Sequence, residues 1–272
     1  GFTTRDERRV SPATRIEVVT EGVLTRRLQN DPSLDGTAIV IFDEVHERNL
    51  QTDLGLALAL DARSTLRPDL RILAMSATVQ ADRFAALLGG EEGPCPRIDA
   101  SGTPFEVDIR YLPPTRNQRL EEIVANTVLR AKKTETGDML VFLPGAGEIN
   151  RVFDMLDGAL RNDRIDVRPL YGMLPAAEQD AALFPSPEGR RRVVLATDIA
   201  ESSLTVEGVR IVIDAGLSRV PRFDVRTGMT RLRTVTASRS SADQRAGRAG
   251  RQMPGVAYRL WSKLEHATRR TD

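Results

Sequence analysis

Short apolar runs alternate with longer helical stretches along most of this chain, and this alternation limits its fold more than any other feature. The clearest runs, AIVIF at 38–42 and VVLA at 193–196, lack the alternate polar positions of a half-buried strand. Strands that are apolar throughout are buried on both faces, and helices between them cover the two faces of a parallel sheet. The sequence therefore predicts an α/β fold built on parallel sheets.

The hydrophobic periodicity also places the individual elements. Strands are expected at 16–19, 38–42, 70–75, 105–111, 139–143, 167–171, 192–196 and 210–213, and helices at 21–29, 50–66, 82–88, 120–133, 148–160 and 176–183. The rhythm is interrupted between Gly89 and Arg119, where Gly and Pro concentrate. We therefore expect two α/β units with a boundary near residues 100–116.

Length and cysteine content restrict the class of protein. The chain has 272 residues, enough for two domains of common size. Its one cysteine, Cys95, cannot form an internal disulfide, and with only two histidines, His46 and His266, a multi-ligand zinc site is excluded. No apolar run approaches the roughly 20 residues that span a bilayer, and no signal-peptide pattern opens the chain. We expect a cytoplasmic protein without a membrane partner.

The positive charges are unevenly distributed, although the net charge is only +1. Lysine occurs only at 132, 133 and 263, while residues 219–251 hold nine arginines against Asp224 and Asp243. Guanidinium groups match pairs of phosphate oxygens, so this stretch favours a phosphate-rich partner. A general preference for arginine on a solvated surface is the alternative.

Two carboxylates, Asp43 and Glu44, directly follow the predicted strand at 38–42. Open α/β sheets bind ligands at the carboxyl ends of their strands. In phosphoryl-transfer sites an aspartate there holds Mg²⁺ on a nucleotide, and a following glutamate orients the attacking water. The alternative is that both acids only stabilise a helix N-terminus. A zinc-protease interpretation of HERNL is weaker still, because Leu50 stands where the second histidine would be needed.

Polar residues follow two further predicted strands. Ser76 and Thr78 end LAMSATV, where they would bridge to a neighbouring element or simply cap the next helix. LATDIAESSLTVEGVRIVIDAG at 195–216 repeats the layout of a strand, a polar loop and a second strand. Both polar segments are therefore predicted to lie at the carboxyl edge of a parallel sheet.

Three arginines are regularly spaced in SADQRAGRAGR at 241–251. Arg245, Arg248 and Arg251 lie three residues apart, which on a helix puts them on one face. Gly247 and Gly250 lie between them, and glycine in a helix costs about 1 kcal/mol relative to alanine. We infer that the glycines permit close approach of another backbone or a ligand. Arginines supplied by one domain to the nucleotide of another stabilise the transition state of phosphoryl transfer.

Four motifs follow one another across the two predicted units: DEVH at 43–46, SAT at 76–78, TDIAESSLTV at 197–206 and QRAGRAGR at 244–251. Together they closely resemble motifs II, III, V and VI of the DEAH-box helicases of superfamily 2. VVTEGVL is similar to motif Ib and VFLPGAGEI to motif IV of that family. With VPRFDVRTGMTRL, the chain resembles the bacterial HrpB-type ATP-dependent helicases over nearly its whole length.

The resemblance implies two RecA-like, P-loop NTPase-type domains, with roles for particular residues. Asp43 would hold Mg²⁺, mostly through water and with Glu44 beside it, Glu44 would activate the hydrolytic water, and His46 would link the nucleotide site to the second domain. Ser76 and Thr78 would couple hydrolysis to domain movement. The remaining implied roles are water positioning by Gln244, arginine fingers at Arg248 and Arg251, RNA contacts at Thr20, Glu21, Gly22 and Thr205, and a strand-separating hairpin around Thr227 and Gly228. Asp198 stands where the family usually has Asn, so no contact is assigned to it.

The phosphate-binding loop of such enzymes, GxxxxGK[ST], has no counterpart before Asp43, because the first lysine is Lys132. We therefore expect a fragment with a first RecA-like domain truncated at its N-terminus (1–104), a linker (105–116) and a second RecA-like domain (117–272). With ATP and Mg²⁺ as cofactors, the whole enzyme would unwind RNA, which it would bind as a single strand, and the fragment alone would be inactive. A non-catalytic nucleic-acid-binding module and a DNA translocase are the alternatives.

Overall fold

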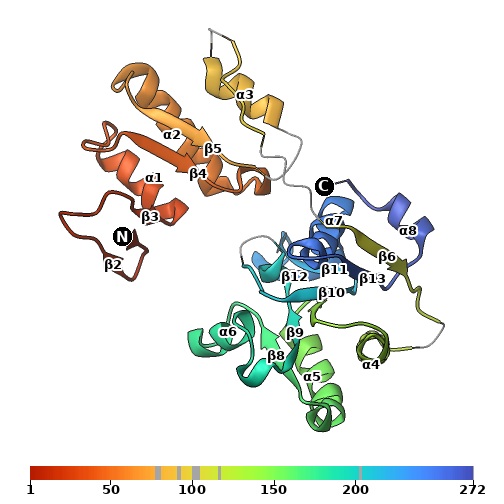
Figure 1. Ribbon diagram of the computed structural model, residues 1–272. Helices are drawn as coiled ribbons and strands as arrows, with labels where there is room; N and C mark the ends of the chain where they lie inside the picture. The colour runs from red at the N-terminus through yellow and green to blue at the C-terminus, as the bar shows by residue number, and fades with distance from the viewer. Residues whose placement is uncertain (77–80, 91–92, 100–104, 116–117, 202–203, 272) are drawn as a thin grey trace. The chain divides into compact units, whose positions relative to one another are not determined.

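The computed structural model describes residues 1–76, 81–90, 93–99, 105–115, 118–201 and 204–271. The chain divides into two compact units, Gly1–Ser101 and Gly102–Asp272 (Figure 1).

The second unit is built on a six-stranded sheet in which every neighbouring pair of strands is parallel. The strand order is β6-β13-β10-β7-β9-β8. The strands are β6 (Val107–Tyr111), β7 (Asp138–Phe142), β8 (Ile165–Leu170), β9 (Arg191–Ala196), β10 (Val209–Asp214) and β13 (Gly255–Arg259). The α/β fold class predicted from the sequence is confirmed.

Helices cover both faces of this sheet because its strands are apolar on both sides. Successive residues of β7 point to opposite faces: Met139 and Val141 belong to one buried cluster, Leu140 and Phe142 to the other. The first cluster contains α4 (Leu120–Thr134) and α5 (Ala146–Leu160), and the second contains residues of α6 (Ala176–Leu183) and α7 (Arg239–Gly247).

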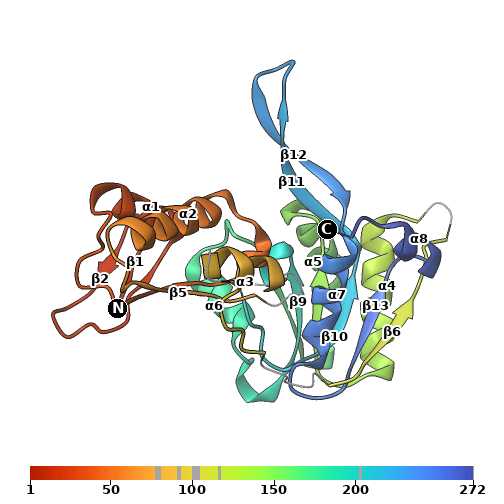
Figure 2. The ribbon, with the colours of Figure 1, turned by 90° about the horizontal axis from the view of Figure 1, so that it is seen from above.

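Several elements of the second unit are absent from the periodicity prediction. β11 (Leu217–Asp224) and β12 (Met229–Thr236) form an antiparallel hairpin, which Figure 2 shows projecting from the sheet, and α8 (Lys263–Thr268) lies near the end of the chain. The hairpin strands carry arginines and are largely exposed, so no hydrophobic pattern marks them. The short strand β13 was missed as well.

The first unit contains two small sheets. β1 (Phe2–Thr3), β2 (Arg8–Arg9) and β3 (Val18–Val19) form one, and β4 (Ile39–Phe42) pairs in parallel with β5 (Arg71–Ala74) in the other. The helices are α1 (Glu21–Asn30), α2 (Leu50–Thr65) and α3 (Ala81–Gly89). Val40 and Phe42 are buried with α1 and α2, while Ile39 and Ile41 on the other face of β4 are exposed.

The predicted linker at 105–116 needs a correction. Val107–Tyr111 is the edge strand β6, which pairs with β13 residue by residue from Val107–Gly255 to Tyr111–Arg259. The strand expectation for 105–111 is thus the better description, since backbone pairing ties this segment to the second sheet. Within the described residues, every helix is too short or too polar to cross a bilayer.

Candidate functional site

The loop after β4 presents the two predicted carboxylates. Asp43 is exposed, and its Oδ1 accepts a hydrogen bond from the backbone N–H of Glu44 at 2.9 Å. Glu44 has a left-handed backbone (φ 50°), which turns the chain into a 3₁₀ turn at Val45–Glu47 before α2 begins. A non-glycine residue in this region is uncommon and often marks a functional site. The local fold therefore displays the carboxylates rather than burying them.

Backbone hydrogen bonds tie this loop to the end of β5. Met75 donates to the carbonyl of Phe42 at 2.8 Å, and Val45 donates to the carbonyl of Met75 at 3.1 Å. Ser76, the next residue, is exposed at the same edge of the sheet as Asp43. The predicted neighbourhood of DEVH and SAT is thus present, whereas Thr78 lies outside the described residues.

His46 lies beside the second carboxylate. Its Nδ1 is 3.3 Å from Glu44 Oε2, and its side chain is only 8% exposed, against 36% for Glu44. The imidazole therefore lies against Glu44 within the first unit.

The carboxylates suit a magnesium ion held mainly by water and phosphate. Among the described residues, no group of three or more His, Cys, Asp or Glu side chains is arranged to hold a metal alone. Mg²⁺ in nucleotide sites is held by one or two carboxylates together with phosphate oxygens and water. Exposed Asp43, with Glu44 next to it, matches that requirement.

The predicted RNA contacts of the first unit lie at the start of α1. Thr20 is the N-cap residue, with no hydrogen bond from its side chain to the helix, and Glu21 and Gly22 form the first turn. All three residues are exposed, and nothing lies within 4 Å of a Cβ placed on Gly22. Helix N-termini favour anions, although Glu21 opposes one here. Thr20 and Gly22 are thus the two of these exposed residues that would not repel a phosphate.

In the second unit, one buried arginine connects three segments. Arg245 on α7 is fully buried and donates to Asp198 Oδ1 at 2.7 Å, Glu201 Oε2 at 2.8 Å and Asp214 Oδ1 at 3.0 Å. Its guanidinium also lies 5.0 Å from the ring centroid of Phe142. The arginine thereby fixes the loop after β9 to α7 and to the end of β10.

Burial and charge act together in this cluster. Burial lowers the pKa of the Arg245 guanidinium, but the carboxylates of Asp214, Glu201 and Asp198 outweigh it, so that its pKa is raised. Burial raises the pKa of Asp198, with Arg245 opposing it. One arginine thus faces three acids, a balance that leaves the cluster net negative when all are ionised.

Arg248 and Arg251 hold the same loop further along. The Arg248 guanidinium is buried and donates to the carbonyls of Glu201, through Nε at 2.8 Å, and of Leu204 at 2.6 Å. Arg251 is exposed and donates to Thr205 Oγ1 at 3.0 Å. The two predicted arginine fingers therefore contact the loop that carries the predicted RNA residue Thr205.

The prediction of one arginine face on one helix is wrong. α7 ends at Gly247, Arg248–Gly250 is a 3₁₀ turn, and Arg251 lies beyond it. Arg245 and Arg248 are buried, whereas Arg251 is exposed, so the three side chains do not share one environment. Gln244, on α7, is half-buried.

The two glycines of this segment have different surroundings. A Cβ on Gly250 would lie 2.5 Å from the carbonyl oxygen of Phe105, whose N–H donates to the carbonyl of Gly250 at 3.0 Å. A Cβ on Gly247 would meet nothing within 4 Å. Close backbone approach thus explains Gly250 but not Gly247.

The predicted hairpin is present, and Thr227 and Gly228 form its tip. Both backbone N–H groups donate to the carbonyl of Asp224, at 3.2 and 2.9 Å, and Gly228 has φ 65°. The hairpin exposes apolar and cationic side chains together: Phe223, Val225, Met229, Leu232, Arg222, Arg226, Arg231 and Arg233. Such a surface can stack on bases and contact phosphates.

Glu201 and Asp214 were not predicted as site residues, and Arg245 was predicted only as part of an arginine triplet, although the three are hydrogen-bonded together in the second unit. One signal was available for Asp214, an acid at the end of the apolar run VRIVID. A carboxylate there is buried and requires a partner. The identity of that partner could not be read from the sequence, since Arg245 lies 31 positions away.

Comparison with known proteins agrees with these features. The helicase conserved C-terminal domain matches residues 116–253, which is half of the chain, so the chain belongs to that family of helicases. More narrowly, it belongs to the DEAH/RHA group, since it is 47% identical to the crystal structure of the Escherichia coli DEAH/RHA helicase HrpB, with a TM-score of 0.90. That match covers 100% of this chain and 34% of the crystallised one.

Curated relatives support the same placement. The chain is 49% identical over 263 residues to the ATP-dependent RNA helicase HrpB of Escherichia coli, covering 97% of this chain and 32% of the relative. It is 34% identical to the ATP-dependent RNA helicase HrpA of Borreliella burgdorferi, covering 99% of this chain and 32% of the relative. The chain thus spans about a third of the length of these relatives.

Proposed function

We propose that this chain is part of the motor of an ATP-dependent RNA helicase, in which ATP hydrolysis drives movement along, and unwinding of, RNA. The observation that supports this most is the set of contacts from Arg245, Arg248 and Arg251 to the loop between Asp198 and Thr205. A segment that would contact the phosphates of ATP is there hydrogen-bonded directly to a segment that would contact RNA.

On the nucleotide side, Asp43 and Glu44 would hold Mg²⁺, which when bound would neutralise charge on the phosphates of ATP. Glu44 would accept the proton of the attacking water, with Gln244 positioning that water. Arg248 and Arg251 would stabilise the charge that develops on the transferred phosphoryl group. For Arg248 this requires release of the Glu201 and Leu204 carbonyls that it now contacts.

On the nucleic-acid side, Thr20, Gly22 and Thr205 would contact the backbone of single-stranded RNA, with Glu21 beside them. The hairpin tip at Thr227–Gly228 would separate strands. His46, Ser76 and Thr78 would couple hydrolysis to relative movement of the two domains. Such backbone contacts are salt-dependent.

The experiment compares this chain with a longer protein that also carries a GxxxxGK[ST] loop. We expect no ATPase activity from the 272 residues alone and RNA-stimulated hydrolysis from the longer protein. Glu44→Gln should lower that activity by about 100-fold or more, because the general base is lost. RNA binding without any hydrolysis would favour the non-catalytic module instead, and stimulation by DNA but not RNA would favour a translocase.

A further inference from the structure

A buried arginine outside the predicted motifs joins α7 to the sheet. Arg259 is the last residue of β13, and its side chain is only 2% exposed. Its Nη2 donates to the carbonyl of Ala242 at 3.1 Å and to Asp243 Oδ1 at 2.5 Å, both on α7. The next residue of that helix is Gln244, which the family resemblance assigns to positioning of the attacking water. Arg259 thus contacts the helix at the residues directly before Gln244.

The other terminal nitrogen of this guanidinium is held by side chains from β6 and α8. Arg259 Nη1 donates to Tyr111 Oη at 3.0 Å and lies 3.2 Å from His266 Nε2. A guanidinium can only donate, so the imidazole accepts at Nε2 and is neutral. Burial and the charge of Arg259 lower the pKa of His266, with Asp243 opposing them, which favours this neutral form. The guanidinium is therefore fixed by β6 and α8 as well as by α7.

Arg245 follows Gln244 and anchors the same helix to the sheet. It donates to Asp214 at the end of β10, the strand next to β13, and Asp214 pairs with Arg259 in the register of the two strands. One arginine thus reaches from α7 to β10, and the other reaches from β13 to α7. Gln244 lies between the anchored positions, so a shift of α7 relative to the sheet would displace its side chain.

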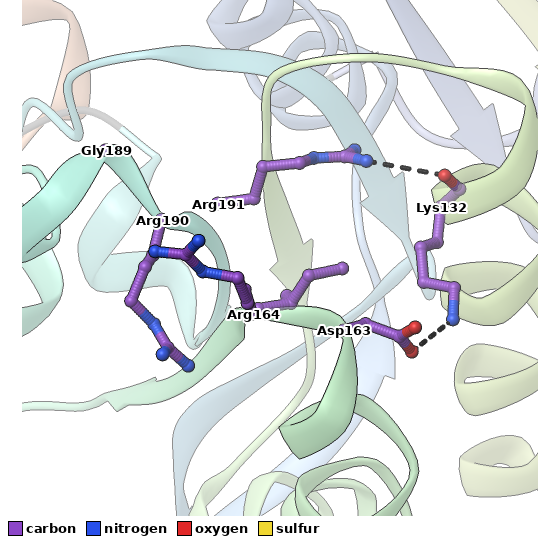
Figure 3. Close-up of a pocket in the computed structure, with 7 residues that line it drawn as sticks. Lys132, Asp163, Arg164, Gly189, Arg190 and Arg191 are labelled. Atoms are coloured by element: carbon purple, nitrogen blue, oxygen red, sulfur yellow. Dashed lines mark hydrogen bonds and ion pairs between the residues drawn. The ribbon is translucent and has the colours of Figure 1, made fainter.

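An arginine at the opposite edge of the sheet offers a comparison. Arg191 is the first residue of β9, and Figure 3 shows its side chain reaching the carbonyl of Lys132 on α4. Its Nη1 donates to that carbonyl at 3.3 Å, and its Nε donates to the carbonyl of Gly137 at 2.9 Å. It joins a strand to a helix as Arg259 does, but none of the predicted site residues lies on α4. Loss of Arg191 should therefore affect the fold without affecting the candidate site.

We propose that Arg259 is a positioning residue for ATP hydrolysis, which acts by fixing the part of α7 that presents Gln244. Its guanidinium is buried among β6, α7 and α8, so it acts through the helix and not by contact with the nucleotide. The planar fork can hold Tyr111 and Ala242 at once, which a single amine cannot. This inference rests on the proposed helicase function, since Gln244 has its role only where ATP is hydrolysed.

Amide hydrogen exchange in this chain tests the fixation of α7 without any nucleotide. Arg259→Met should speed exchange of the amides of residues 243–247 by about tenfold or more, because local opening of the helix becomes easier. Arg191→Met is the matched control, and it should speed exchange in the last turn of α4 but not in α7. If the amides of α7 exchange no faster in Arg259→Met than in Arg191→Met, the proposal is overturned.

RNA-stimulated ATP hydrolysis by the longer, loop-bearing protein tests the consequence for catalysis. Arg259→Met should lower kcat by about tenfold or more, since a small misplacement of a positioning group is costly. KM for ATP should change by less than about twofold, and Arg191→Met should leave kcat within about twofold of the parent value. Gln244→Ala combined with Arg259→Met should lower kcat no further than Gln244→Ala alone, because Arg259 acts through Gln244.

A milder substitution covers the case in which Arg259→Met does not fold. Arg259→Lys keeps the buried charge but loses the fork, so it should fold and still lower kcat by about threefold or more. An unchanged kcat in Arg259→Lys, or an equal loss of kcat in Arg191→Met, overturns the proposal. If the longer protein hydrolyses no ATP at all, the proposed function fails, and the exchange experiment still decides whether Arg259 fixes α7.

Discussion

The two units place polar residues at the carboxyl edge of a parallel sheet in opposite ways. In the first unit Asp43 is exposed, and its Oδ1 accepts a hydrogen bond from the N–H of the next residue. In the second unit Arg245 is fully buried and bound to three carboxylates from three segments. The first arrangement leaves a group available to a ligand, and the second builds the loop that carries other such groups. The carboxyl edge of a parallel sheet can therefore hold either exposed groups that a ligand can reach or buried groups that fix the neighbouring loops.

Two single residues allow the units to be observed separately. Trp261 is the only tryptophan, is buried in the second unit and lies under the Arg269 guanidinium at 3.9 Å from its ring centroid. Cys95 is the only cysteine and packs against the core of the first unit. Tryptophan fluorescence thus reports unfolding of the second unit, and thiol reactivity reports unfolding of the first.

The largest effect is expected for Arg245→Met. Removal of the guanidinium leaves Asp198, Glu201 and Asp214 close together without their cation, which should lower the free energy of unfolding by about 3–5 kcal/mol. Urea unfolding followed by Trp261 fluorescence measures this loss. Arg251→Met is the control, since Arg251 is exposed and should change stability by less than about 0.5 kcal/mol. Equal urea midpoints for Arg245→Met and Arg251→Met would show that the buried arginine contributes no more to stability than the exposed one.

The second prediction uses the two glycines of the same segment. Gly250→Ala places a Cβ 2.5 Å from the Phe105 carbonyl oxygen, so it should destabilise the second unit by about 1–3 kcal/mol. Gly247→Ala should instead stabilise it by about 0.5–1 kcal/mol, because Gly247 has helical φ and ψ and open space around it. Each variant is the other's control. If both substitutions changed stability in the same direction, close backbone approach would not distinguish Gly250 from Gly247.

Much of this architecture was predictable, and the misses have physical causes. The strands of the six-stranded sheet that are apolar throughout, such as 193–196, were found because burial on both faces leaves a continuous pattern. The hydrophobic pattern did not indicate β11 and β12, because an exposed hairpin needs no such pattern, and only the family resemblance implied a hairpin around Thr227 and Gly228. The position of Asp43 at the end of a strand could be predicted because it is a local signal. The partners of Arg245 come from distant segments, and sequence spacing does not reveal them.

The third prediction concerns an ion pair in the first unit, between Glu17 and Arg27. Glu17 binds both terminal nitrogens of Arg27, at 2.5 and 2.9 Å, and accepts from Thr3 Oγ1 at 2.5 Å. The hydrogen bonds from Arg27 and Thr3 lower the pKa of Glu17 from 4.5 to about 2. The pKa is lower in the folded state, so this stabilisation is complete above pH 4.5 and is lost as the pH falls toward 2.

Glu17→Gln should therefore cost about 1 kcal/mol at neutral pH, since both side chains are partly exposed to solvent screening. The variant should also lose less stability than the parent between pH 4.5 and 3. The reactivity of Cys95 toward 4,4′-dithiodipyridine, which reacts with thiols in acid, follows the first unit alone. Parallel pH profiles for the two proteins would show that the Glu17–Arg27 pair does not support α1.

The smallest effect on stability is expected for a substitution of the exposed residue Asp43. Asp43→Asn retains Oδ1 as an acceptor for the Glu44 N–H and removes a charge that lies in solvent. Stability of the first unit, measured by Cys95 reactivity in urea, should therefore change by less than about 0.5 kcal/mol. Hydrolysis by the longer, loop-bearing protein should nevertheless be lost, because Asn supplies no negative charge to Mg²⁺. If Asp43→Asn lowered stability as much as Arg245→Met, Asp43 would be a structural residue. The carboxyl edges of the two sheets would then not differ in the way described above.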